Sequence, residues 1–238
     1  MLEFIFMNQN SKKLSAEKFF ASVTNEYDNL IDRSVPRHAE MLEMVLVYLP
    51  EKNGHLTILE LGCGTGKLTC KILNKFPKAK LEIIDISLEM LKATEKSISN
   101  NSNIKYIQSD FKDLDLHSNQ YDFVLSSISI HHLIDKEKEN LIKKIFYWLK
   151  PKGILCFGDQ FRGVRDEYYR KHIDTWKQYA DKNGIATEIW EKWMRHQGES
   201  DYHCTIGDYY NWLQKVGFKN IDCLWRYALW AVLIAEKD

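Results

Sequence analysis

From about residue 56 onward, the hydrophobic positions of the chain alternate between two periods. Short strand-like runs, each bounded by polar or turn residues, occur at 57–61, 80–85, 104–108, 121–128 and 153–159. Helical patterns lie between them, most clearly over 88–98 and from after Asp135 to Leu149, where Lys150-Pro151-Lys152-Gly153 stops the helix. Strands that alternate with helices form right-handed βαβ units, so the pattern predicts a mostly parallel, doubly wound sheet with helices on both faces.

The C-terminal end of the chain follows a different pattern. The runs FKNIDCLW and YALWAVLIAEK are two strand-like segments with almost nothing between them, which predicts an antiparallel hairpin on the sheet edge. Together with the five earlier strands, this hairpin makes a seven-stranded sheet. We therefore expect an α/β domain composed of residues 51–160 and 206–238.

Two further regions are helical in pattern and lie outside this scheme. Residues 1–50 form a predicted N-terminal arm. Residues 161–205 are far longer than the usual connection of ~2–6 residues in such sheets. Helical spacing there separates Tyr169, Ile173, Trp176 and Ala180. We interpret this insertion as a helical cap over the carboxyl end of the sheet.

Composition narrows the function classes. Lysine and arginine together number 33, as do aspartate and glutamate, so no overall electric field favours nucleic acid or an acidic membrane. The five cysteines include no CxxC pair, which favours reduced thiols in a cytoplasmic protein. The opening MLEFIF is too short for a secretory signal, and no apolar stretch reaches the ~18 residues of a membrane span.

The turn after the first strand carries three glycines at alternate positions, Gly62, Gly64 and Gly66. Backbone without Cβ atoms permits positive φ and close approach of a ligand, and the helix start that follows favours polar groups. A dinucleotide fingerprint requires a third glycine at position 67, which is Lys67, and a P-loop requires Ser or Thr where Leu68 stands. Both nucleotide motifs therefore fit poorly.

Acidic residues stand at the ends of the first three strands: Glu60, Asp85 and Asp110. A carboxylate at the second strand end can accept both hydroxyls of a ribose, and Glu60 can accept from a cationic amine. Asp110 is positioned to accept from an adenine amino group, with Phe111 and Ile86 on the ring faces. Three carboxylates around a glycine turn suit an uncharged nucleoside with an amino acid tail better than a phosphate.

These motifs resemble the class I S-adenosylmethionine (SAM)-dependent methyltransferases. The resemblance covers roughly residues 55–160 plus the closing hairpin and rests on ELGCGTG at 60–66, IDIS at 84–87, SD at 109–110, YDFVLSS at 121–127 and LKPKG at 149–153. It implies a Rossmann-like fold, SAM as cofactor and S-adenosylhomocysteine as product. By resemblance the cofactor contacts are Glu60, Gly62, Cys63, Gly64 and Gly66, then Asp85, Ile86, Met90, Asp110, Phe111 and Ser127.

The segment YDNLIDRSVP at 27–36 resembles a narrower branch that includes carboxy-SAM synthase, an enzyme of tRNA modification. In that branch the N-terminal arm closes over the cofactor, which makes Tyr27 and Arg33 candidate contacts. The synthase also uses a cap arginine; Trp193 stands near that place here, and Arg195 follows two positions later. We expect methyl transfer to an unidentified, small-molecule acceptor. The alternatives are a synthase-like enzyme and a non-catalytic SAM-binding module.

Methyl transfer depends mainly on alignment, with a base only where the nucleophile carries a proton. His131 and His132 follow the fourth strand and are the candidate catalytic residues, because imidazole titrates near neutral pH. Packing of the loop is the competing interpretation for both. His196, His203 and Cys204 match no standard metal spacing, so we assign no metal site. The pattern leaves a homodimer open.

Overall fold

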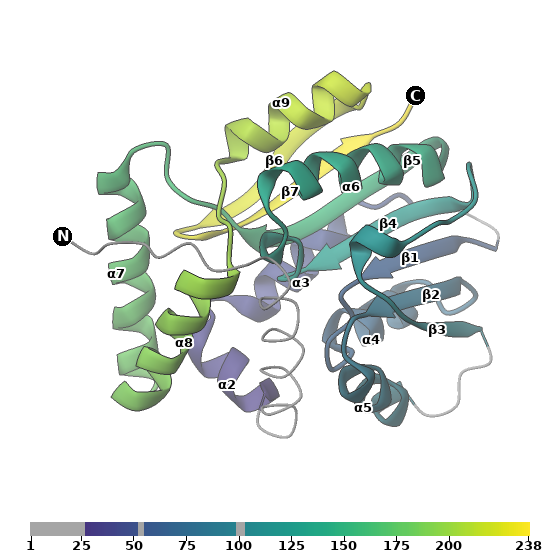
Figure 1. The fold of residues 1–238 in the computed structure, drawn as a ribbon. Helices are drawn as coiled ribbons and strands as arrows, with labels where there is room; N and C mark the ends of the chain where they lie inside the picture. The colour runs from purple at the N-terminus through teal and green to yellow at the C-terminus, as the bar shows by residue number, and fades with distance from the viewer. Residues whose placement is uncertain (1–26, 52–54, 99–102) are drawn as a thin grey trace.

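The structure is a computed structural model that describes residues 27–51, 55–98 and 103–238. Its centre is one sheet in the order β3-β2-β1-β4-β5-β7-β6 (Figure 1). The strands are β1 Thr57–Leu61, β2 Lys80–Asp85, β3 Ile104–Gln108, β4 Tyr121–Ser127, β5 Leu149–Gln160, β6 Lys219–Tyr227 and β7 Trp230–Glu236. The first five strands pair in parallel, and β7 is antiparallel to both β5 and β6. The predicted fold class, a seven-stranded, mostly parallel sheet with a C-terminal antiparallel hairpin, is confirmed.

The limits of two central elements differ from the predicted ones. The helix expected to run to Leu149 ends at Trp148, and β5 begins at Leu149 rather than at residue 153. Leu149 pairs with Tyr121 at the start of β4, so no loop separates helix from strand. An apolar residue at this junction fits the helical period and the strand period equally, which is why the pattern alone misplaced the boundary.

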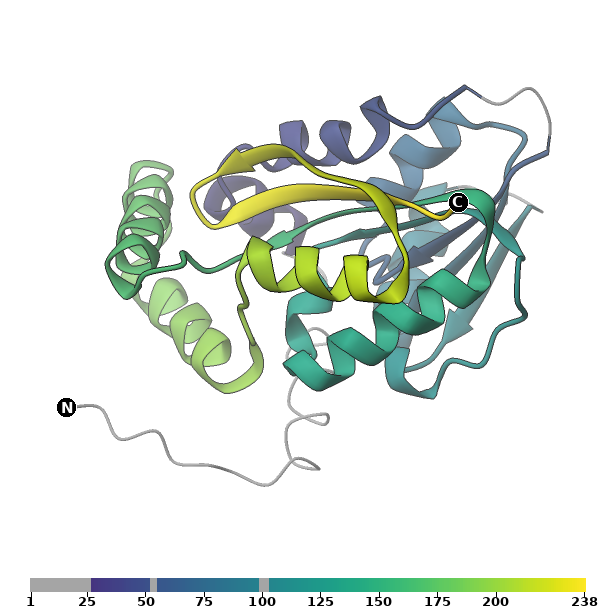
Figure 2. The ribbon, with the colours of Figure 1, turned by 90° about the horizontal axis from the view of Figure 1, so that it is seen from above.

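Helices cover both faces of the sheet. In the described residues they are α2 Tyr27–Ser34, α3 His38–Val47, α4 Lys67–Lys75, α5 Leu88–Ile98, α6 Asp135–Trp148, α7 Asp166–Lys182, α8 Thr187–Ser200 and α9 Ile206–Val216, with short 3₁₀ turns η1 Phe111–Asp113 and η2 Ile130–His132. Seen from above, α6 and α9 lie on one side of the sheet, and α3 and α4 lie on the other (Figure 2). None of the helices in the described part of the chain combines the length and apolar composition that a bilayer crossing requires.

Alternate residues of the strands feed two hydrophobic cores. On β1, Ile58 joins the core beneath α3 and α4, whereas its neighbour Leu59 joins the core beneath α6. The same alternation separates Phe123 from Val124 on β4. This period of two, with burial on both faces, is the physical reason for the nearly continuous hydrophobic runs in the sequence.

The helices of the long insertion stand at the end of the sheet toward which the parallel strands point (Figure 1). Trp176 of α7 packs edge-on against Trp190 of α8 and Trp230 of β7, with ring centroids 5.0 and 5.2 Å apart. Its indole nitrogen donates to the Ser34 carbonyl over 2.8 Å, which ties α7 to α2. Residues 161–205 therefore rest on both the sheet and the N-terminal helices, while the division into separate domains stays a prediction.

Candidate functional site

A cavity of about 310 Å³ opens at the carboxyl ends of β1, β2, β3 and β4. The predicted cofactor residues that line it are Glu60, Gly62, Cys63, Gly64, Asp85, Ile86, Met90, Asp110, Phe111 and Ser127. Of the two predicted catalytic residues, His132 lines it. These residues come from four strand ends, and a parallel sheet brings such ends together at one edge.

Of the three other predicted cofactor residues, two do not line the cavity and the side chain of the third lies outside the described part of the chain. Gly66 has φ 90° and is the N-cap of α4, where an added Cβ would press on Thr94 and Ser97 of α5. Arg33 points to the end of α7, where it donates from Nε to the Asn183 carbonyl over 3.0 Å. Tyr27 is the first residue of α2, and its side chain lies outside what the structure describes.

Two glycines of the turn after β1, Gly62 and Gly64, differ in what surrounds the position of a Cβ atom. Gly62 has φ 74°, and a Cβ there would overlap the side chain of Ser129. Gly64 has φ 54°, and no atom lies within 4 Å of the place where its Cβ would stand. Gly62 is therefore required by close packing, whereas Gly64 presents bare backbone to open space at the cavity.

Glu60 is fully buried at the end of β1 and lines the cavity. Neither of its carboxylate oxygens has a hydrogen-bond partner among the described residues. Burial raises the pKa of Glu60 to about 8; the hydroxyl of Thr69 opposes the shift and the charge of Asp85 adds to it. An unpaired buried carboxylate is costly, so this position suits a cationic ligand that would supply the missing partner.

Asp85 holds the glycine turn in place. Its Oδ2 accepts from the backbone nitrogen of Gly64 and its Oδ1 from that of Ser87, each over 2.9 Å. Burial raises the pKa of Asp85, and these two donors oppose the shift. One carboxylate thus joins the turn after β1 to the start of α5, and each oxygen keeps a second lone pair for a ligand.

The exit from β3 presents an aromatic face beside a carboxylate. Asp110 caps η1 by accepting from the backbone nitrogen of Lys112 over 3.0 Å, and Phe111 follows it. Ile86 lines the same cavity from the end of β2, and the side chain of Gln108 donates to its carbonyl over 3.2 Å. Local hydrogen bonds at the ends of β2 and β3 therefore hold Ile86 and Phe111 in place beside the cavity.

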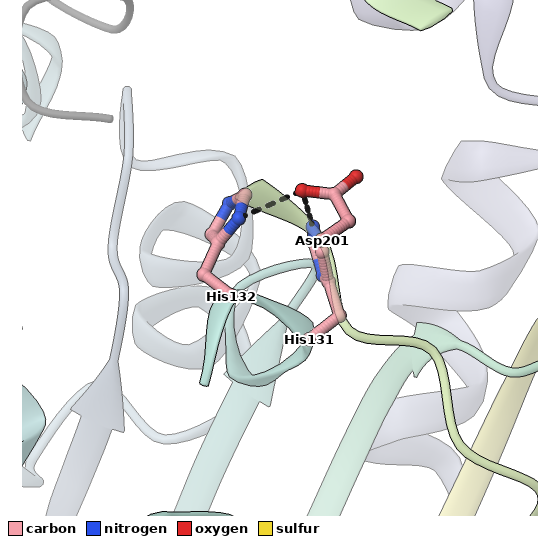
Figure 3. Close-up of side chains that lie close together, drawn as sticks. All are labelled: His131, His132 and Asp201. Carbon is pink, nitrogen blue, oxygen red and sulfur yellow. Dashed lines mark ion pairs between the residues drawn. The ribbon is translucent and has the colours of Figure 1, made fainter. Parts of the chain in front are cut away.

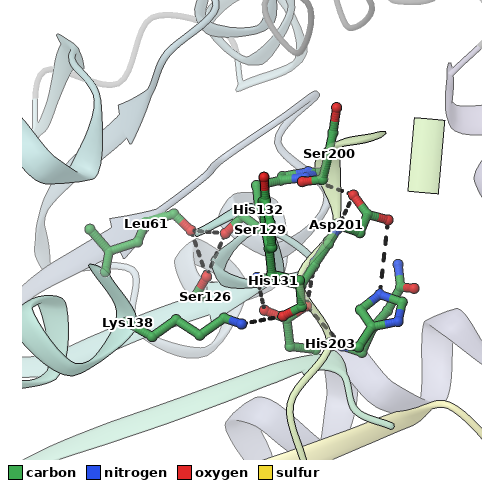
Figure 4. Close-up of polar contacts among 12 residues, drawn as sticks. Leu61, Ser126, Ser129, His131, His132, Lys138, Ser200, Asp201 and His203 are labelled. Atoms are coloured by element: carbon green, nitrogen blue, oxygen red, sulfur yellow. Dashed lines mark hydrogen bonds and ion pairs between the residues drawn. The ribbon is translucent and has the colours of Figure 1, made fainter. Parts of the chain in front are cut away.

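The exit from β4 is held by serines. The hydroxyls of Ser126 and Ser129 donate to the Leu61 carbonyl over 2.7 and 3.0 Å and lie 2.8 Å apart (Figure 4). Between them, Ile128 has φ 48°, an unusual conformation for a β-branched residue, and it lines the cavity beside Ser127. Such strain persists only where surrounding contacts enforce it, and the serine network supplies them.

The N-terminal helices close one side of the cavity. Lys67, directly after the glycine turn, pairs with Asp32 of α2 over 2.6 Å, and the hydroxyl of Thr65 donates to Asp28 over 2.6 Å. Ile31 and His38 line the cavity from α2 and α3. Sequence analysis missed these two; the resemblance indicated the arm, but nothing in the spacing shows which of its faces turns inward.

Imidazoles and carboxylates gather at the other side of the cavity. His132 Nδ1 lies 3.0 Å from Asp201 Oδ1, and His131 Nε2 lies 3.6 Å from the same oxygen (Figure 3). Behind them, His131 Nδ1 is 2.6 Å from Asp159 Oδ1 at the end of β5. The Tyr202 nitrogen donates to the His131 carbonyl over 2.8 Å, which joins the segment after α8 to η2. Buried Lys138 donates to the Tyr202 carbonyl, which joins the same segment to α6.

The pKa values of His131, His132 and Asp201 shift in different directions. Burial lowers the pKa of His131 well below the usual value, and the charge of His132 acts in the same direction. The pKa of His132 is raised: burial alone would lower it, but the Asp201 carboxylate beside it outweighs burial. The pKa of Asp201 is lowered because the surrounding histidines overcome its desolvation. Asp201 and Tyr202 are site residues that sequence analysis missed.

Comparison with known proteins agrees with the geometry. A family model described as a methyltransferase domain matches residues 58–153. A malonyl-[acyl-carrier protein] O-methyltransferase of Halalkalibacterium halodurans is 30% identical over 74% of this chain, which spans 64% of that protein. The ubiquinone/menaquinone biosynthesis C-methyltransferase UbiE of Wigglesworthia glossinidia brevipalpis is 30% identical over 74% of this chain and 71% of its own length. Carboxy-SAM synthase of Campylobacter hominis is 26% identical over both whole chains.

Solved structures show the same fold. Phosphoethanolamine N-methyltransferase 2 of Haemonchus contortus, with phosphomonomethylethanolamine and S-adenosylhomocysteine bound, matches with a TM-score of 0.70 at 15% identity. That match covers 98% of this chain and 61% of the other. With its glycine turn, strand-end carboxylates and sheet order, the chain belongs to the class I SAM-dependent methyltransferases.

Proposed function

We propose that the chain transfers a methyl group from SAM to a small-molecule acceptor, with the cofactor held by Glu60, Gly62, Gly64 and Asp85. The observation that carries this proposal is the buried Glu60 carboxylate, which lines the cavity without a hydrogen-bond partner among the described residues. The ammonium group of the methionine part of SAM is a cation of suitable size. Pairing with it would remove the cost of the unmatched carboxylate.

The remaining cofactor roles follow the chemistry of each position. Asp85 uses one lone pair of each oxygen on backbone donors, which leaves acceptors for two ribose hydroxyls. Ile86 and Phe111 would cover the faces of adenine, and Asp110 would accept from its amino group. The open space at Gly64 favours close approach of the methionine part to the backbone.

Methyl transfer requires the protein mainly to align the methyl donor with the acceptor. SAM supplies a methyl group already activated on a sulfonium centre. Positioning two reactants can account for ~7–11 kcal/mol of barrier lowering in favourable cases. His132 lines the cavity and is the histidine suited to contact the acceptor, whereas His131 is 3% exposed and would act through its neighbours. Met90, Leu133 and Ile134 line the same cavity and would exclude water.

A small-molecule acceptor is supported by the cavity of about 310 Å³ beside the cofactor residues and by the bound phosphomonomethylethanolamine of the Haemonchus contortus structure. The net charge of zero offers no support for a nucleic-acid acceptor. The proposal therefore names an acceptor that fits beside SAM within the cavity. Screening candidate acceptors for release of S-adenosylhomocysteine would identify it.

Carboxy-SAM synthesis is the second candidate, supported by similarity to that synthase over the whole chain. Holding an additional carboxylate calls for a cation from the cap. Trp193 instead packs against Trp176, with ring centroids 6.2 Å apart, and Arg195 is exposed. These positions favour ordinary methyl transfer. Native mass spectrometry of freshly purified protein distinguishes the two, because co-purified carboxy-SAM would support the synthase.

Calorimetric titration with SAM tests the cofactor site directly. We expect Glu60→Gln, which keeps the shape and removes the charge, to raise the dissociation constant about 10- to 100-fold, as for loss of a charged hydrogen bond. Glu95→Gln on the exposed side of α5 is the matched control and should leave affinity unchanged. Unchanged affinity in Glu60→Gln would contradict the assignment, and an absence of binding to the unaltered protein would overturn the proposed function.

A further inference from the structure

Four histidines surround one carboxylate at the cap side of the cavity. His131 and His132 come from η2, and His203 comes from the segment before α9, with Asp201 among them (Figure 4). His196 comes from α8. His196 Nε2 and His203 Nε2 are each 3.9 Å from an oxygen of Asp201. We call these five residues the histidine cluster. The cofactor roles proposed above leave them unused except for His132 at the cavity wall.

The nitrogens converge more than hydrogen bonding explains. His131 Nε2, His132 Nδ1 and His196 Nε2 lie 3.6, 3.0 and 3.9 Å from one atom, Asp201 Oδ1. None of the three is a hydrogen bond, because Asp201 Oδ1 has no hydrogen-bond partner among the described residues. The rings of His131 and His132 are also only 4.0 Å apart between centroids. One carboxylate oxygen and three imidazole nitrogens therefore form a compact group of four potential metal-ligand atoms.

The spacing suits a metal ion. One ligand atom each from His131, His132 and Asp201 lies within 4.8 Å of the others. Zinc binds imidazole nitrogen at ~2.0–2.1 Å and carboxylate oxygen at ~2.0–2.2 Å, so tetrahedral ligands around it are roughly 3.3 Å apart. The distances of 3.0 and 3.6 Å lie on either side of that value. Small side-chain rotations would therefore complete the geometry.

The outer contacts orient the rings as metal ligands. Asp159 lies against His131 Nδ1 over 2.6 Å and also accepts from the backbone nitrogens of His131 and Gln160. An ionised carboxylate only accepts, so the His131 proton is on Nδ1 and the lone pair of Nε2 faces Asp201. His203 Nδ1 is likewise 2.8 Å from the Tyr169 hydroxyl, which leaves its Nε2 turned inward. Carboxylate–histidine pairs of this kind support ligands in metalloproteins.

We propose that His131, His132 and Asp201 bind a divalent transition-metal ion of the zinc or ferrous class, with His196 and His203 close enough to add a ligand. Imidazole nitrogen with one carboxylate suits these ions, whereas magnesium and calcium prefer oxygen alone. Because His132 lines the cavity, a coordination position left open by the protein faces the space beside the cofactor residues. The inference stands on the cluster alone and does not require the methyltransferase chemistry.

The test uses the full chain without an affinity tag, since a histidine tag would itself bind metal. After chelator treatment and dialysis, the protein is titrated with cobalt(II), followed by visible absorption, and with zinc by calorimetry. We expect one saturable site per chain, with an intense tetrahedral-type cobalt spectrum. Asp201→Asn should weaken binding at least 10-fold, and Asp159→Asn, behind His131, should weaken it about 10- to 100-fold.

His117→Asn is the matched control, because His117 is exposed and lies outside the cluster. It should bind cobalt as the unaltered chain does. If Asp201→Asn fails to fold, as judged by circular dichroism, His132→Gln at the partly exposed rim takes its place. Absence of saturable binding, or equal binding in the cluster variants and the control, would overturn the proposal. Intact metal binding with no SAM binding would instead contradict the proposed function alone.

Discussion

The two sides of the cavity are built in different ways. On one side, Glu60, Gly62, Gly64 and Asp85, which we call the cradle, belong to two neighbouring strand ends joined by one carboxylate. On the other side, the histidine cluster joins a turn of the sheet to a segment about 70 residues later. The cradle is therefore determined by strand register, whereas the cluster depends on how the insertion packs.

The two sides also differ in how their polar groups are satisfied. The cradle leaves Glu60 without a partner in the described structure, so it is complete only with a cation. In the cluster, Asp201 Oδ1 also has no hydrogen-bond partner among the described residues, but the neighbouring histidines lower the pKa of Asp201 despite its burial. A site that is incomplete in the free protein should respond strongly to its ligand and to pH. A carboxylate that neighbouring histidines already stabilise in its charged form, as in the cluster, should respond more weakly to pH near neutrality.

The largest effect is expected from disturbing the cradle at its tightest point, with Gly62→Ala. The new Cβ would overlap Ser129 and would hold a positive φ, so strain of ~1–2 kcal/mol adds to overpacking of ~1–3 kcal/mol. We expect the free energy of unfolding to fall by about 2–5 kcal/mol. Urea unfolding followed by circular dichroism measures it, provided the slope with denaturant is unchanged.

Gly198→Ala is the control for that change on the cap side. Gly198 lies within α8, and no atom is within 4 Å of its Cβ position. Alanine in a helix is favoured over glycine by roughly 0.5–1 kcal/mol, so this variant should be slightly more stable. Similar losses in both variants would mean that the tightness of the cradle is not specific to the Gly62 turn.

The contrast between the cradle and the histidine cluster also explains which site residues the sequence could predict. Glu60, Asp85 and Asp110 each follow a run with a clear strand period, and a parallel sheet necessarily brings successive carboxyl ends to one edge. Strand ranges 57–61, 80–85 and 104–108 were predicted to the residue because polar or turn residues bound each run. The positions of these carboxylates therefore needed no knowledge of side-chain packing.

The partners of His131 and His132 could not be predicted in this way. The two histidines were identified after the fourth strand, but Asp201 follows α8, and its place depends on long-range contacts. Among these are the packing of Trp176 against Trp230 and the hydrogen bond from Tyr202 to the His131 carbonyl. No period in the sequence encodes such contacts. The expectation of no metal site considered only the spacing of His196, His203 and Cys204, whereas the site proposed above includes the two histidines of η2.

A second way to sharpen the comparison is proton release on cofactor binding. Burial raises the pKa of Glu60 to about 8, so at pH 6.5 the free protein holds a proton there. Pairing with an ammonium group favours the carboxylate, and binding of SAM should release close to one proton. Calorimetry at pH 6.5 in two buffers of different ionisation enthalpy measures the number. Glu60→Gln should release none from this position.

The Glu60 carboxyl also predicts how the free energy of unfolding changes with pH. The unfolded pKa of about 4.5 lies below the folded value of about 8, so the folded protein binds the additional proton between them. The contribution of Glu60 to the free energy of unfolding therefore decreases as pH rises from about 4.5 to 8. Added SAM should flatten this dependence. A pH profile identical in the unaltered protein and Glu60→Gln would contradict the burial of an unpaired carboxylate.

The smallest effect concerns Arg33, where the resemblance and the structure lead to different expectations. The resemblance predicts a cofactor contact, but the guanidinium donates to the carbonyls of Asn183 and Gly184 at the end of α7, over 3.0 and 2.5 Å. These bonds satisfy the helix terminus and join the N-terminal arm to the cap. Arg33→Ala should therefore lower the free energy of unfolding by about 1 kcal/mol.

SAM affinity should stay within twofold in Arg33→Ala, because the side chain lies outside the cavity lining. Arg170→Ala, at an exposed position of α7, should change stability by less than about 0.5 kcal/mol and serves as the control. A tenfold loss of affinity with unchanged stability would instead support the cofactor contact. It would also mean that the arm moves to the cradle when SAM binds, which would require Arg33 to release both α7 carbonyls first.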